Sequence, residues 1–113
     1  MNRLEEISKQ REKAHGKLLA LKSKVYEAFL EMEKATYSDG ALPRKTKELI
    51  AVGISVVIDC ESCMQWHIEQ AAKQGATAAE VLEAVEVAME MGGGPATASA
   101  RFALDVMDST YGK

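Results

Sequence analysis

The sequence predicts a single all-α domain of about five helices, and three observations lead to this fold class. Apolar residues recur with helical spacing over most of the 113 residues, and helix start and stop signals divide the chain into segments of helical length. Aromatic residues make up only 5% of the chain, whereas Ala, Leu, Met and Val are plentiful. With 47% hydrophobic and 27% charged residues, the composition is that of one folded globular domain spanning residues 1–113.

Residues 1–35 are predicted to form one long amphipathic helix. Gly16 lies inside this segment and would weaken the helix by only about 1 kcal/mol. A narrow apolar seam of this kind suits packing against one other helix, in this chain or in a neighbouring subunit. The seam has steps of three and four residues, is interrupted only by Arg11, and consists of Leu4, Ile7, Ala14, Leu18, Leu21, Val25, Ala28 and Met32.

The predicted core, residues 40–108, follows a loop that runs from Tyr37 to Pro43. Its first element runs from Arg44 to Ile58, and the β-branched stretch from Val52 to Ile58 is also compatible with a buried strand. We favour a helix, because the segment is long for a strand and begins with polar helix formers. Its apolar stretch is predicted to be buried.

Three further helices are predicted from capping signals. Asp59 is the expected N-cap of a helix that reaches Lys73 and stops at Gly75. The segment 77–80 has a capping-box pattern and opens the next helix, which the glycines and proline of 92–95 end. The last helix carries Ala98, Phe102, Ala103 and Val106.

Charge and hydropathy exclude two classes of partner. The net charge is −3, so no nucleic-acid partner is expected. The segment Met1 to Lys13 is polar and does not resemble a signal peptide, and the longest apolar stretch, Leu49 to Ile58, is far shorter than the roughly 20 residues of a membrane span. We therefore expect a cytoplasmic protein with no membrane partner.

The chemistry of the chain is concentrated in Cys60, Cys63 and His67. Two cysteines at this spacing in a cytoplasmic protein indicate redox chemistry or metal binding. On a helix, these three positions share one face, and the side chain of His67 leans back toward the sulfur of Cys63. The sequence thus predicts a thiol pair with a base beside it.

Two arguments favour different nucleophiles. Cys60 near a helix N-terminus gains from the helix dipole and is the expected entry point for an external thiol. Cys63 has His67 as its base, so it is preferred for attack on a small oxidant. If the two helices are antiparallel neighbours, Glu48 could meet His67 and complete a carboxylate–imidazole–thiol relay.

Other interpretations of these residues remain. Cys60, Cys63, His67 and Glu48 could together bind zinc, although three ligands on so short a helical segment strain tetrahedral geometry. A thioredoxin fold also leads a β-branched segment into a pair of cysteines, but no strands follow Cys63. His15 is expected to have no role in the chemistry.

The motif itself resembles a known family. Glu48, the segment 60–63 and His67 have the spacing of the AhpD-like alkylhydroperoxidases, within the carboxymuconolactone decarboxylase family, and the resemblance covers about residues 40 to 108. It implies an all-α fold that assembles as homo-oligomers, commonly trimers or hexamers. It also implies that the cysteine pair reduces small organic hydroperoxides and is reset by a dithiol or thioredoxin-like reductant.

The resemblance also implies roles for the four residues. Cys63 would attack the peroxide, Cys60 would resolve the product, and Glu48 and His67 would relay protons; no bound cofactor is required. Two alternatives stay open, a carboxymuconolactone-type decarboxylase, which does not need the cysteine pair, and a zinc-binding or redox-sensing interaction module.

Overall fold

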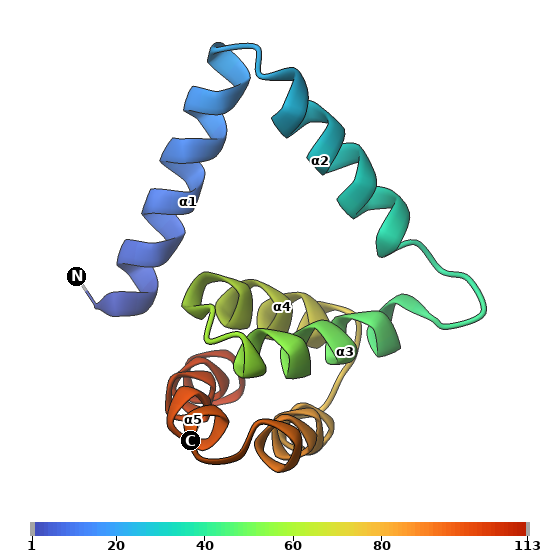
Figure 1. Cartoon of the computed structure of the whole chain (residues 1–113), viewed down its shortest axis with the longest axis vertical. Coiled ribbons are helices and arrows are strands. Elements are labelled where there is room, and N and C mark those ends of the chain that lie inside the picture. Colours follow the sequence, from blue (N-terminus) through green and yellow to red (C-terminus); the bar gives the residue numbers. More distant parts are fainter. Residues whose placement is uncertain (1, 113) are drawn as a thin grey trace. The chain divides into compact units, whose positions relative to one another are not determined.

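The computed structural model describes residues 2–112, which form the five helices α1 to α5 (Figure 1). The predicted all-α class is therefore confirmed. The chain divides between Asp39 and Gly40 into two compact units. The second unit coincides closely with the predicted core. That the whole chain acts as one domain stays a prediction.

The first unit contains α1, Arg3–Ala20, and α2, Lys24–Thr36, so the prediction of one long helix is wrong. The break lies at Lys22, whose φ of 55° is in the left-handed region. The amide of Lys22 donates to Leu19 O (3.0 Å) and that of Ser23 to Leu18 O (3.2 Å), the bonding pattern of a Schellman motif. The Ser23 side chain then caps the next helix.

An apolar stripe on α2 lies at the surface. Val25, Phe29 and Met32 are 83%, 48% and 59% exposed, and no residue of this helix is buried. The helix is held to α1 through a hydrogen bond between the His15 ring and the Tyr26 hydroxyl, whose rings also meet edge to face. His15, for which no role in the chemistry was expected, thus makes a structural contact inside the first unit.

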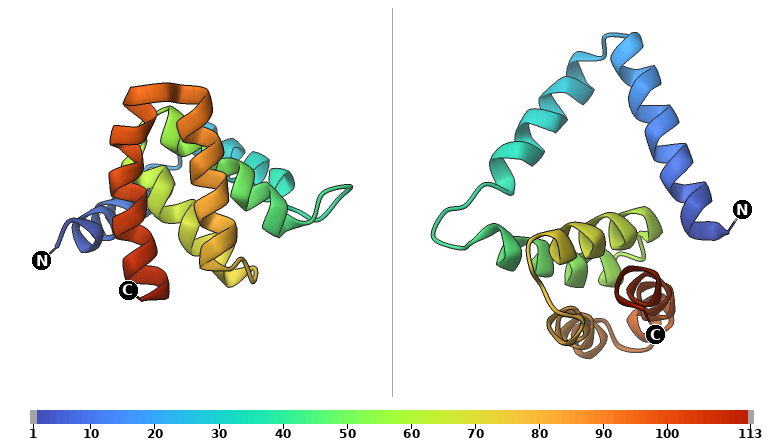
Figure 2. Two further views of the ribbon diagram at one scale, coloured as in Figure 1. Left: turned by 90° about the horizontal axis from the view of Figure 1, so that it is seen from below. Right: turned by 180° about the vertical axis from the view of Figure 1, so that it is seen from behind.

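The second unit contains α3, Arg44–Val57, α4, Glu61–Lys73, and α5, Ala78–Tyr111. The helical interpretation of the segment from Arg44 is confirmed, and Thr77 and Glu80 form the predicted capping box. The long α5 is interrupted at Gly93, so that its two arms run antiparallel, side by side (Figure 2). The arm before the break and the arm after it correspond to the two predicted C-terminal helices.

Glycines make the reversal in α5 possible. Gly93 has φ 67° and ψ −146°, a conformation that is essentially restricted to glycine. A Cβ at Gly92 would lie 2.5 Å from the Cβ of Ala96, so the first turn of the second arm can approach only a residue without a side chain. The sequence 92–95 therefore encodes a tight reversal.

The three helices of the second unit enclose a common core. Each contributes one buried face, and the buried apolar residues there are Val52, Val56, Met64, Ile68, Ala71, Ala76, Val81, Val85, Ala88, Ala96, Ala100, Ala103 and Val106. The apolar stretch ending at Ile58 is only partly buried, contrary to prediction, because Ile54, Val57 and Ile58 lie on the face of α3 that no other helix of this unit covers. In the second arm of α5, Ala98 is exposed, whereas Ala103 and Val106 are buried. Within residues 2–112, no helix is long and apolar enough to cross a membrane.

Candidate active site around a cysteine pair

The turn between α3 and α4 determines where the cysteines lie. Asp59 has a φ of 55°, a conformation that Asp tolerates better than most residues. Its amide donates to Val56 O (3.2 Å) and that of Cys60 to Ser55 O (3.0 Å), which makes Asp59 the left-handed residue that ends α3. The prediction that Asp59 caps α4 is therefore wrong.

Cys60 is the N-cap of α4 in its place. Its sulfur accepts a hydrogen bond from the amide of Cys63 (3.2 Å), in the way that Ser or Asp side chains cap helices. Cys60 and Cys63 are joined by a disulfide, with their Cα atoms 5.2 Å apart. The pair is therefore oxidised in this structure, and both cysteines are only partly buried.

Glu48 and His67 meet across α3 and α4. The Nδ1 atom of His67 lies 2.8 Å from Oε1 of Glu48, although the two residues are nineteen positions apart. The carboxylate is 1% exposed, whereas the imidazole is 14% exposed. The short turn at Asp59 makes the two helices antiparallel neighbours, which is the arrangement on which the predicted contact depended.

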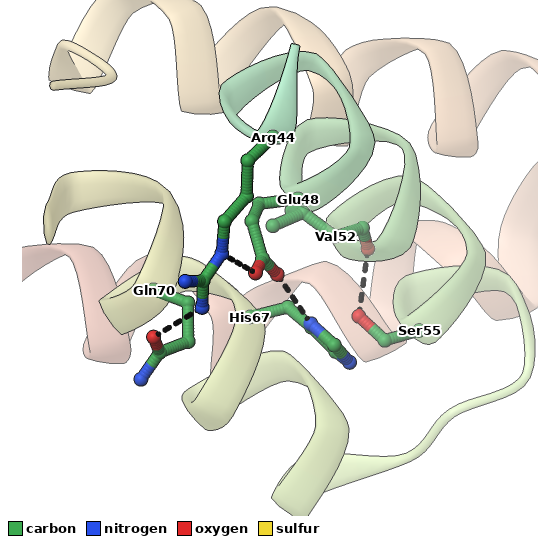
Figure 3. A network of polar contacts seen from close by, with 6 residues as sticks. All are labelled: Arg44, Glu48, Val52, Ser55, His67 and Gln70. Atoms are coloured by element: carbon green, nitrogen blue, oxygen red, sulfur yellow. Dashed lines mark hydrogen bonds and ion pairs between the residues drawn. The ribbon is translucent and has the colours of Figure 1, made fainter. Parts of the chain in front are cut away.

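Two residues that the sequence reasoning missed complete this network. The Nε atom of Arg44 donates to Oε2 of Glu48 (3.2 Å), and its terminal NH2 donates to Oε1 of Gln70 (3.0 Å). Figure 3 shows the guanidinium between the carboxylate on α3 and the amide on α4. The sequence did carry a signal, because Arg44 precedes Glu48 by four residues and Gln70 follows His67 by three, both on-face helical spacings.

The site thus combines a redox couple at the start of α4 with a buried ionic network that links α3 to α4. A carboxylate with this little exposure is stable only when it is paired and hydrogen-bonded, and here both oxygens have a partner. Because an ionised carboxylate only accepts hydrogen bonds, the Nδ1 of His67 is the donor. The Nε2 atom of a neutral His67 then carries the lone pair and can act as a base.

The zinc alternative gains no support from the arrangement. Within the described range 2–112, no three His, Cys, Asp or Glu side chains are grouped so that they could hold a metal ion. Both sulfurs are bonded to each other, and Nδ1 of His67 is engaged by Glu48. The four predicted residues therefore form two bonded pairs rather than one ligand set, and their catalytic roles remain predictions.

The sequence pattern of the carboxymuconolactone decarboxylase family matches residues 23–105 of this chain. The chain belongs to the carboxymuconolactone decarboxylase family. Relatives within reach of sequence comparison include the uncharacterized protein 4 in the cox locus of Paracoccus denitrificans, 43% identical over 76% of this chain and 78% of that protein. Another is the uncharacterized protein H16_B0147 of Cupriavidus necator, 37% identical over 95% of this chain and 91% of that protein.

Solved structures of family members have the same fold. The apo form of lpg0406, a carboxymuconolactone decarboxylase family protein from Legionella pneumophila, matches with a TM-score of 0.91 and 32% identity over the whole of both chains. TM1620 from Thermotoga maritima, for which involvement in an antioxidative response has been suggested, matches with a TM-score of 0.83 and 26% identity over 92% of this chain and 88% of that one. These matches agree with the AhpD-like branch expected from the cysteine motif.

Proposed function

We propose that this family member is a thiol-dependent oxidoreductase that reduces organic hydroperoxides through Cys60 and Cys63. The observation that carries the proposal is the bridged, partly exposed cysteine pair at the N-terminus of α4, whose second member precedes by four residues a histidine bonded to a buried carboxylate. A disulfide that closes between neighbours on one helix turn can form and open without rearrangement of the core. This is what a catalytic redox pair requires.

The first chemical step uses Cys63 as the nucleophile. Its thiolate attacks the terminal oxygen of the hydroperoxide, so that an S–O bond forms as the O–O bond breaks. The alkoxide leaving group takes a proton and departs as an alcohol. His67 supports this step, since Nε2 can first accept the Cys63 proton and then return it to the leaving oxygen. The sulfur is oxidised to a sulfenic acid, and the peroxide is reduced.

Cys60 then resolves the sulfenic acid. Its thiolate attacks the sulfur of Cys63, an S–S bond forms, and the hydroxyl leaves as water with one proton. The helix N-terminus favours a negative charge on Cys60, because unpaired backbone amides point toward the cap position. A dithiol or thioredoxin-like reductant resets the pair by disulfide exchange and is itself oxidised. A cytoplasmic location, where reducing thiol systems operate, belongs to this proposal.

Two further observations support peroxide chemistry over the alternatives. The antioxidative role suggested for the Thermotoga maritima relative is compatible with it. A lactone decarboxylase has no use for the cysteine pair, and a purely structural disulfide has no use for the adjacent Glu48–His67 pair.

The test is steady-state turnover of cumene hydroperoxide with a dithiol reductant. Wild type should turn over, Cys63→Ser should not, and Cys60→Ser should stall with a sulfenic acid on Cys63 that dimedone traps. Ser109→Ala, on α5, is the control. Equal turnover in the wild type and in the double variant C60S/C63S would overturn the proposal, and retained turnover of a lactone in that double variant would favour the decarboxylase.

A further inference from the structure

Arg44 stands out because its side chain, which comes from α3, bonds both Glu48 on α3 and Gln70 on α4. Its guanidinium donates through Nε to the Glu48 carboxylate and through the terminal NH2 to the Gln70 side chain. The Arg44 side chain is 38% exposed, while that of Glu48 is 1% exposed and Gln70 is 8% exposed. The guanidinium therefore lies at the mouth of a buried polar network (Figure 3).

We propose that Arg44 is a positioning residue, which fixes the Glu48 carboxylate so that His67 is held in the Nδ1–H tautomer. This inference rests on the proposed thiol chemistry, because it assigns a function to the nitrogen that faces away from Glu48. Arg44 itself need not contact substrate.

The two oxygens of Glu48 explain how the effect is transmitted. Oε2 is taken by Arg44 at 3.2 Å, which leaves Oε1 for His67 at 2.8 Å. A carboxylate held from both sides cannot rotate without losing both bonds. The guanidinium donates to the carboxylate and cannot accept from it, and a carboxylate paired in this way accepts a hydrogen bond from Nδ1–H of His67.

The choice of arginine over lysine follows from the geometry. The planar guanidinium carries donors that point in fixed, different directions, so one group can bind a carboxylate on α3 and an amide on α4 together. A lysine ammonium at this position would supply the charge but not the two donors in fixed, different directions. Arg44 would thus hold the spacing of the two helices that bear Glu48 and His67.

The tautomer of His67 gives a readout that does not depend on turnover. The chain has two histidines, so nitrogen resonances of His67 can be assigned by comparison with His15→Gln. In the wild type, a long-range ¹H–¹⁵N spectrum should show protonated Nδ1 and unprotonated Nε2 at His67. In Arg44→Gln, the signals should move toward the Nε2–H form, which imidazole prefers in water, while Arg44→Lys should give a partial shift.

Lys45→Gln provides a matched control. Lys45 is the next residue on α3, its side chain is also 38% exposed, and it is also ion-paired, with Glu80 at 3.0 Å. Losing that pair should leave the His67 spectrum unchanged. Gln70→Leu removes only the second anchor of Arg44 and should give a smaller shift than Arg44→Gln, and circular dichroism would confirm that every variant is folded.

Kinetics complete the test. The rate of Cys63 oxidation by cumene hydroperoxide should fall by about tenfold in Arg44→Gln. This decrease should be smaller than the decrease on loss of His67 itself. In Arg44→Lys, the rate should lie between those of Arg44→Gln and the wild type. A His67 spectrum in Arg44→Gln identical to wild type would overturn the positioning role but not the peroxidase proposal. Conversely, a shifted spectrum in a protein whose wild type consumes no peroxide would support the role of Arg44 and refute the proposed substrate.

Discussion

Replacing Glu48 with Gln tests the network with the smallest change in shape. Both carboxylate oxygens accept hydrogen bonds, from His67 Nδ1 at 2.8 Å and from Arg44 Nε at 3.2 Å. A glutamine offers one accepting oxygen and one donating NH2 group, so it cannot accept from both partners. Because the position is 1% exposed, water cannot readily replace the missing acceptor.

The structure sets the size of the expected effects. One unsatisfied donor at a buried position should lower the free energy of unfolding by about 1–3 kcal/mol. The loss of an oriented base should lower the rate of Cys63 oxidation by about a hundredfold or more. The free energy would be measured by urea denaturation, and the rate by stopped-flow mixing of the reduced protein with cumene hydroperoxide.

Glu86→Gln is the control for this variant, because Glu86 is an exposed residue of α5. It should leave both quantities within error of wild type. If Glu48→Gln retains the wild-type rate of Cys63 oxidation while folding normally, then the Glu48–His67 pair is structural, and the relay as described is wrong.

Three further predictions concern the scaffold. Gly93→Ala forces an alanine into a glycine-only conformation and should lower the free energy of unfolding by about 1–3 kcal/mol in a urea titration, whereas Gly94→Ala, where a Cβ meets nothing within 4 Å, should change it much less. The pKa of Glu80 is lowered from its ordinary value of 4.5, first by the backbone hydrogen bond from Thr77 and then by the side chain of Lys45, so the stability that its charge supplies is complete above that value and is lost as the pH falls through the lower folded-state value. The stabilities of wild type and Glu80→Gln should therefore differ at neutral pH and converge in acid, and a difference that stays constant with pH would contradict this assignment. We also propose that copies of the chain associate through the apolar groove of about 690 Å³ between α3 and α5, so Ile54→Glu in that groove should lower the assembly mass in light scattering, and an unchanged mass would exclude this surface.

The fold could be predicted from sequence where the signals are local. The capping box at Thr77 and Glu80 and the glycine reversal at 92–95 are specified by residues adjacent in the chain, and both are present. Lys22 and Asp59 were missed for a common reason. Each adopts the left-handed conformation that ends a helix. Glycine is the usual sequence signal for this conformation, so a lysine or an aspartate did not lead to its prediction.

The residues of the site divide in the same way, into those that local spacing predicts and those that depend on how the helices pack. Cys63 and His67 lie on α4 and Cys60 caps its N-terminus, so spacing along the chain was sufficient to place all three at the start of one helix. The contact of Glu48 with His67 depends on how α3 and α4 pack. The sequence therefore predicted it only for the case in which the two helices are antiparallel neighbours. Arg44 and Gln70 had the right spacing, but a surface arginine and a glutamine carry no chemical signature of their own.

The central claim is that peroxide drives the formation of the Cys60–Cys63 disulfide. The most direct test mixes the fully reduced protein with one equivalent of cumene hydroperoxide, without reductant, and measures intact mass, free thiols and product alcohol together. The account predicts an intramolecular disulfide, the loss of both thiols and one alcohol formed per chain. Thiols that stay reduced, or a disulfide that forms without the alcohol, would contradict it.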